Sequence, residues 1–204
     1  MKKEGGTQWT IYSFAAVDHA LTCKDTDIAA AEAATLISFF KRNLAYEQAM
    51  EFAEYVANSF SETPGPSQGL IGFYIQKGLL LLETGTHRKA LADFENARRI
   101  CAQVHNTEHS DIAAILNNMG SAYEALGDAK RAIEYFEKAL KIDLAVFGDS
   151  HPNVAIRYNN LGESYRDLGE VPRAIEYFEK ALKIDLAVFG ESHPNVAKSF
   201  NNLG

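Results

Sequence analysis

Three pairs of adjacent asparagines are the sharpest recurring polar feature of this chain: Asn117-Asn118, Asn159-Asn160 and Asn201-Asn202, spaced 42 residues apart. Asparagine is an indifferent helix former, so its repetition inside apolar segments needs an explanation. A ladder of side-chain amides would offer donors and acceptors to the backbone of an extended peptide. In the alternative, one asparagine of each pair bonds a neighbouring structural unit and the other is solvated. We expect a mixture, with at least one asparagine of each pair in a binding groove.

The same segments carry further polar and charged side chains of both signs. Together with the six asparagines they form the predicted groove residues, and the additional members are Ser121, Arg157, Glu163, Arg166 and Lys198. The three cations among them would add recognition of charge on the ligand. A solvated helix face explains most of these charges equally well, so the sequence leaves both interpretations open.

Signals for catalysis are poor. The serines lack a G-x-S-x-G setting, Cys101 has no paired base, and Gly69-x2-Gly72 is too weak to indicate a phosphate loop. His105 and His109 are four residues apart, but the residues between them have loop character, which breaks the common helix face that a zinc site would need. We therefore expect a protein that is not an enzyme and has no cofactor and no metal site.

Composition narrows the class of partner. The chain has 204 residues, and its 20 Lys+Arg against 27 Asp+Glu give a net charge of −7, which offers no basic stripe to a nucleic acid. No run of about 18 apolar residues and no secretory signal is present, so we expect no membrane association. Cys23 and Cys101 lie far apart without a CxxC motif and indicate thiols of a reducing compartment. These features predict a cytoplasmic protein.

An internal repeat organises the chain. The segments 109–150 and 151–192 are both 42 residues long, 27 of the 42 positions are identical, and the block Arg131–Gly148 recurs unchanged at Arg173–Gly190. A further unit opens at His193, and weaker copies precede residue 109. Such a period is the signature of a stacked repeat architecture. The first half of each unit varies while the second half is constant, which suits a recognition helix beside a packing helix; duplication followed by drift is the alternative.

Each unit has the pattern of a helical hairpin. Apolar residues recur at steps of three and four, the spacing of an amphipathic helix, in the second half of one unit and the first half of the next: Ile133, Phe136, Leu140, Leu144 and Phe147, then Val154, Tyr158, Leu161, Tyr165 and Leu168. Gly127 and Gly169 suit the ends of first helices, and Pro152 and Pro194 suit their starts. No alternating strand pattern is present, so the predicted fold class is all-α.

The motifs within these hairpins resemble those of a known family. Leu161-Gly162-x2-Tyr165, followed by Ala174-x3-Phe178, is similar to the tetratricopeptide repeat (TPR) pattern, and Met119-Gly120-x2-Tyr123 with Ala132-x3-Phe136 matches equally well. The period is 42 rather than 34, and the usual proline after the second helix is replaced by Leu144 and Leu186, so we expect second helices that run on to Phe147 and Phe189. This longer form resembles the kinesin-light-chain type of repeat.

The resemblance implies an architecture and a class of function. It implies a right-handed superhelical solenoid of antiparallel helix pairs, with a concave groove lined by first helices that binds a protein or peptide partner. The expected organisation is a capping helix or segment over residues 1–24, a degenerate hairpin over 25–67 and an array over 68–204, with units 68–108, 109–150 and 151–192 and a partial unit 193–204.

The leading hypothesis is therefore a non-enzymatic interaction scaffold that binds a partner peptide or helix in the groove. Two alternatives stay open. In the first, the chain is a self-association module that forms a homo-oligomer through its C-terminal end. In the second, it is a regulatory arm of a larger protein, which includes the case of an enzyme. A repeat fold constrains the shape of a site without naming its ligand.

Overall fold

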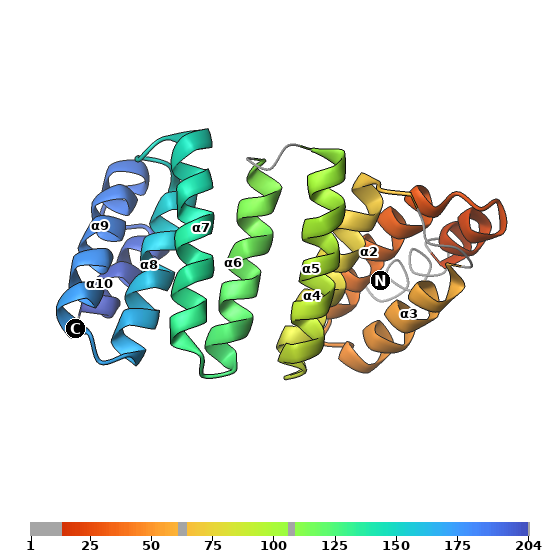
Figure 1. Cartoon of the computed structure of the whole chain (residues 1–204), viewed down its shortest axis with the longest axis horizontal. Coiled ribbons are helices and arrows are strands. Elements are labelled where there is room, and N and C mark those ends of the chain that lie inside the picture. The colour runs from red at the N-terminus through yellow and green to blue at the C-terminus, as the bar shows by residue number, and fades with distance from the viewer. Residues whose placement is uncertain (1–13, 61–64, 106–108, 204) are drawn as a thin grey trace. The chain divides into compact units, whose positions relative to one another are not determined.

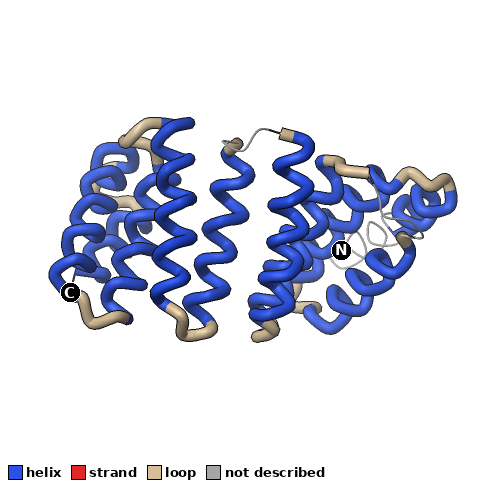
Figure 2. The backbone as a smooth tube through the Cα atoms, viewed as in Figure 1, coloured by secondary structure: helices blue, strands red, loops and turns tan. Residues whose placement is uncertain are grey.

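The computed structural model describes residues 14–60, 65–105 and 109–203, and all the regular structure in these ranges is helical (Figure 2). The predicted all-α class is thereby confirmed. The chain divides into two compact units, Met1–Asn106 and Thr107–Gly204. Within the described ranges, no helix has the length and apolar character needed to span a membrane.

The first unit contains a short helix over residues 14–22 and four longer helices: α2 (Thr26–Arg42), α3 (Tyr46–Ser59), α4 (Gln68–Glu83) and α5 (His87–Val104). The short helix belongs to the expected N-terminal cap. Its Phe14 ring meets the rings of Phe40 and Phe52 edge-on, with centroids 6.0 and 4.5 Å away, and Val17 is buried. Trp9, Ile11 and Tyr12 of the same expected cap lie outside the described residues, as do residues 61–64 of the expected degenerate hairpin.

Helices α2 and α4 pack directly along each other in the first unit. The backbone N–H of Gly69 donates to the Asp27 carboxylate at 2.7 Å, and a Cβ built on Gly69 would lie only 2.2 Å from the Asp27 carbonyl oxygen. One turn further on, a Cβ on Gly72 would meet Ala34 at 3.7 Å. Small residues thus allow these two helices to approach closely at Gly69 and Gly72.

The second unit contains α6 (Ser110–Ala125), α7 (Ala129–Phe147), α8 (Pro152–Asp167), α9 (Val171–Phe189) and α10 (Pro194–Leu203). Each helix packs against the next one in sequence, and consecutive helices run antiparallel (Figure 1). Helices α7 and α9 end at Phe147 and Phe189, which confirms the predicted long second helices. The predicted starts at Pro152 and Pro194 are confirmed as well.

The turns use the residues expected of them. Gly127 and Gly169 have positive φ angles of 76° and 78°, a conformation in which a Cβ would be strained. The first helices begin at histidine caps: Nδ1 of His109, His151 and His193 accepts the backbone N–H two residues further on at 3.1 to 3.2 Å. The His151 and His193 rings also stack on Phe147 and Phe189, with centroids 4.2 and 4.3 Å apart.

A glycine facing a phenylalanine sets the distance between the two helices in three of the hairpins, α4–α5, α6–α7 and α8–α9. A Cβ built on Gly162 of α8 would lie 2.5 Å from the ring of Phe178 on α9. The same close approach occurs between α6 and α7 and between α4 and α5, in the pairs Gly120 with Phe136 and Gly78 with Phe94. The three rings are at most 1% exposed. No side chain larger than hydrogen fits at these glycines without moving the aromatic ring.

Gly162→Ala should therefore destabilise the chain by about 1–3 kcal/mol, because the added methyl group overpacks against Phe178. Gly72→Ala is the matched control, since its methyl group would find ordinary contact and a helix interior favours alanine over glycine by about 1 kcal/mol. Urea unfolding followed by circular dichroism measures both changes. In a Phe178→Leu background the Gly162→Ala penalty should shrink; an undiminished penalty would contradict the proposed contact.

Candidate functional site

The repeated asparagines connect the first helices of the second unit. Asn160 Nδ2 on α8 donates to Asn117 Oδ1 on α6 at 2.7 Å, and Asn202 Nδ2 on α10 donates to Asn159 Oδ1 on α8 at 3.1 Å. The second asparagine of one 42-residue repeat thus bonds the first asparagine of the repeat before it. In the pair Asn159-Asn160 both amides bond a neighbouring repeat, whereas the structural alternative expects one bonded and one solvated asparagine in each pair.

The ladder leaves hydrogen-bonding capacity unused. A side-chain amide has two donor hydrogens and an oxygen with two lone pairs, and each bond of the ladder employs one of these positions on each partner. Asn117, Asn118, Asn160 and Asn202 are half-buried, Asn201 is exposed, and Asn159 is 7% exposed. Four of these amides, those of Asn117, Asn159, Asn160 and Asn202, are therefore held by one bond each, and the half-buried ones among them keep groups that a ligand can reach.

A cavity of about 150 Å³ opens beside this ladder. It is lined by Ile156, Asn159, Asn160, Asp185, Asn195 and Lys198, from α8, α9 and α10. We call it the groove pocket. Three of its six residues belong to the predicted groove residues, namely the two asparagines and Lys198. The structure brings these three together in one hollow.

The other three lining residues were missed by sequence reasoning. Ile156 and Asn195 lie three to four residues before predicted members of the same helices, so helical spacing was an available signal for both. Asp185 lies in the block that is identical in the two full units. That identity favoured a packing role for the whole second helix and gave no hint of an open site.

Arg157 lies away from the open surface. Its Nε donates to Asp143 Oδ2 on α7 at 2.9 Å, and the two side chains are 7% and 0% exposed. Burial raises the pKa of the Asp143 carboxyl and lowers the pKa of the Arg157 guanidinium, and the ion pair opposes both shifts. The pair ties α7 to α8, so we leave Arg157 out of the groove proposal.

The remaining predicted residues lie further along the first helices. Ser121 and Glu163 are half-buried, and the Arg166 guanidinium is exposed and lies 5.7 Å from the centre of the Phe178 ring. Beside them the Ser164 hydroxyl, which sequence reasoning missed, donates to Glu124 on α6 at 3.0 Å. Burial raises the pKa of the Glu124 carboxyl, the Ser164 bond opposes the rise, and the nearby charges of Glu163 and Asp167 add to it.

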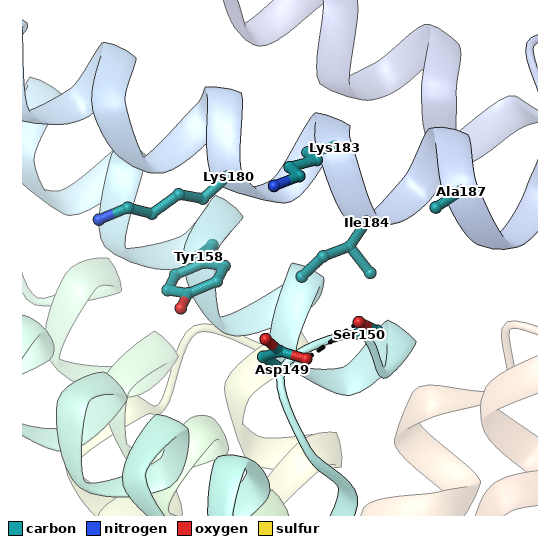
Figure 3. A pocket seen from close by; sticks show the side chains of 7 residues that line it. All are labelled: Asp149, Ser150, Tyr158, Lys180, Lys183, Ile184 and Ala187. Carbon is teal, nitrogen blue, oxygen red and sulfur yellow. Dashed lines mark hydrogen bonds between the residues drawn. The ribbon is translucent and has the colours of Figure 1, made fainter.

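A second hollow of about 180 Å³ lies between the turn that follows α7 and helices α8 and α9 (Figure 3). Tyr158, Ile184 and Ala187 give it apolar walls, and Ser150 donates to Asp149 at its edge at 3.0 Å. Of its two lysines, Lys180 is paired with Glu176 at 2.6 Å and lies over the Tyr158 and Tyr177 rings. Because none of the predicted groove residues lines this hollow, it is a suitable comparison site for tests of the groove pocket.

Known proteins share this architecture. The family profile described as "Tetratricopeptide repeat" matches residues 72–145, 111–187 and 154–204. The crystal structure of BtubC (BKLC) from P. vanneervenii superposes with a TM-score of 0.78 at 22% identity, over 97% of this chain and 81% of that one. A search of curated protein sequences gives no match.

Two further solved structures are similar. A putative kinesin light chain of Podosopora anserina with nearly identical TPR-like repeats gives a TM-score of 0.71 at 22% identity, over 84% of this chain and 81% of that one. The apo form of RapI gives 0.70 at 15% identity, over 87% and 47%. At these identities the likeness concerns the fold alone.

The direction of the ladder's hydrogen bonds predicts that one of two isosteric substitutions destabilises the chain and the other does not. Asn160→Asp replaces the donor and sets two acceptors against each other, which should cost about 1–3 kcal/mol of unfolding free energy at pH 7. Asn117→Asp keeps the acceptor and should leave stability within about 0.5 kcal/mol of the parent. Urea unfolding of both variants checks the direction of the bond, and equal losses in the two would contradict it.

Removing the charge of the half-buried Glu124 should stabilise the fold in a pH-dependent way. A carboxyl whose folded-state pKa lies above its unfolded value of about 4.3 gives stability that is fully present below that value and lost as the pH rises through the folded pKa. Glu124→Gln keeps an acceptor for Ser164 and removes the charge, so its melting temperature should exceed that of the parent by a few degrees at pH 7 and match it near pH 4. Exposed Glu179→Gln is the control; a gain of the same size at both pH values would contradict this origin.

Proposed function

This chain belongs to the tetratricopeptide repeat family, in the kinesin-light-chain-like form that its 42-residue period predicts, and we propose that it is a non-enzymatic scaffold. Its ligand is a peptide segment or helix of a partner protein. The ligand lies along α6, α8 and α10, where the asparagine ladder and the groove pocket are found.

One observation carries the proposal. The paired asparagines hold each other across successive repeats at 2.7 and 3.1 Å, and two of them also line an open pocket. Amides that are fixed in orientation by a first bond lose less side-chain entropy when a ligand makes the second. A preorganised row of amides beside a hollow is suited to hydrogen-bond the backbone of a peptide that runs across the repeats.

The charged residues would select among peptides. Lys198 at the groove pocket and Arg166 further along α8 are exposed cations, and Glu163 is a half-buried anion on the same helix. Such mixed charge favours ligands with a matching pattern and disfavours those that place like charges together.

The two other hypotheses remain alternatives. Self-association through the C-terminal end of the array, and service as the regulatory arm of a larger protein, are both compatible with a repeat unit of this family. Phe200 on α10 is 52% exposed, which gives a homo-oligomer one apolar contact to use. Sedimentation of the chain at several concentrations separates monomer from oligomer.

A peptide-display selection tests the scaffold proposal. A random library is selected on the 204-residue chain, and the affinities of recovered peptides are then measured against Asn195→Ala/Lys198→Ala. Both positions are exposed and line the groove pocket. We expect the double substitution to weaken binding at least about tenfold, as loss of a charged and a neutral hydrogen bond implies.

Lys183→Ala is the matched control, because it removes an exposed lysine beside the second hollow. It should leave the affinities unchanged. Peptides that respond to Lys183→Ala and ignore the groove substitutions would contradict the proposed site.

A further inference from the structure

The two junctions between repeats in the second unit place the same buried carboxylate in different surroundings. Asp143 on α7 and Asp185 on α9 occupy equivalent positions, 42 residues apart, and are 0% and 3% exposed. Each accepts a bond from the residue 14 positions further on. At the first junction that residue is Arg157, whose Nε lies 2.9 Å from Asp143, and at the second it is Ser199, whose hydroxyl lies 2.7 Å from Asp185.

At the second junction a small neutral side chain, Ser199, therefore stands where the first junction has the cation Arg157. Arg157 buries a full positive charge against its carboxylate, whereas Ser199 gives Asp185 a neutral donor only. Beside this second junction lies the groove pocket of about 150 Å³, and the Asp185 that accepts the Ser199 bond is one of its walls. A buried carboxylate without a cation is costly, so a cationic ligand is favoured at this position.

We propose that the groove pocket receives the arginine side chain of the bound peptide, which takes at Asp185 the place that Arg157 takes at Asp143. This inference rests on the proposed function, since it names the ligand side chain that the scaffold recognises. The guanidinium pairs with the Asp185 carboxylate from the groove side, opposite a carboxylate oxygen that Ser199 already fixes.

The rest of the pocket suits a guanidinium. A guanidinium has five N–H donors in a planar fork, and after pairing with a carboxylate it still needs acceptors. Asn160 and Asn195 line the pocket and carry amide oxygens that can accept them, and Ile156 offers an apolar surface to the aliphatic stem. A lysine ammonium would use fewer of these groups, which favours arginine.

Lys198 also lines the pocket and is exposed. The Lys198 ammonium repels an incoming guanidinium. At the first junction the equivalent position, 42 residues earlier, holds the uncharged Ile156. In the bound state the Lys198 ammonium can donate to a carbonyl or carboxylate of the peptide next to the arginine. A short probe that lacks those acceptors should therefore bind somewhat better to Lys198→Gln than to the parent.

The test uses N-acetyl-L-arginine amide as the probe and the citrulline analogue, which has the same shape and no charge, as its control. Each is titrated into the ¹⁵N-labelled 204-residue chain, and amide shifts are followed by NMR. We expect saturable shifts centred on α8 and α10 with the arginine probe and at least about tenfold weaker binding of citrulline.

Two substitutions locate the effect. Asp185→Asn keeps the shape and a partner for Ser199 and should weaken the arginine probe at least about tenfold. Ser199→Arg copies the first junction: it should fill the pocket, abolish probe binding and raise the melting temperature. Citrulline binding as well as arginine, or arginine shifts that persist in Asp185→Asn and Ser199→Arg, would overturn the proposal.

The outcome separates this inference from the scaffold proposal. Display-selected peptides that bind the groove without arginine, and whose affinity is unaffected by Ser199→Arg, would refute the arginine pocket and leave the scaffold standing. Saturable binding of the arginine probe by a chain that selects no peptide would support the pocket and refute the scaffold.

Discussion

The contact between a helical glycine and a buried phenylalanine ring is the constraint on which the rest of the structure depends. It recurs in three successive hairpins, through Gly78, Gly120 and Gly162, and in each the ring occupies the space of the missing Cβ. Because this contact fixes the spacing of the two helices within a hairpin, it also fixes where the first helices lie. In the second unit the contact sets the spacing of α6 from α7 and of α8 from α9, and so positions the asparagines that α6 and α8 carry.

Polar groups carry the second level of organisation, between repeats. The asparagine ladder and the buried carboxylates of Asp143 and Asp185 each connect one 42-residue repeat to the next. Such bonds are directional, so they specify the junction as well as stabilise it. Three of these polar residues, Asn159, Asn160 and Asp185, also line the groove pocket. In the proposed scaffold the residues that join the repeats are thus also the ones that meet the ligand.

Much of the fold could be predicted from the sequence, because it follows from local spacing. The ends of α7 and α9, the proline starts and the positive φ of Gly127 and Gly169 depend on neighbours within a few residues. The groove pocket could not be predicted in this way, because it is lined by residues of three different helices. Asp143 and Asp185 lie in identical local sequences and differ only in the partner that the next helix supplies. The direct packing of α2 on α4 through Gly69 was likewise hidden, because it joins residues 42 positions apart.

A structure of the chain bound to a display-selected peptide tests the central claim most directly, that the row of first helices in the second unit is the recognition surface. The account predicts a peptide lying across α8 and α10, with its backbone bonded to the amides of Asn159 and Asn160 and a side chain in the groove pocket. A peptide seated in the second hollow, against Tyr158 and Lys183, with the groove pocket empty, would contradict it.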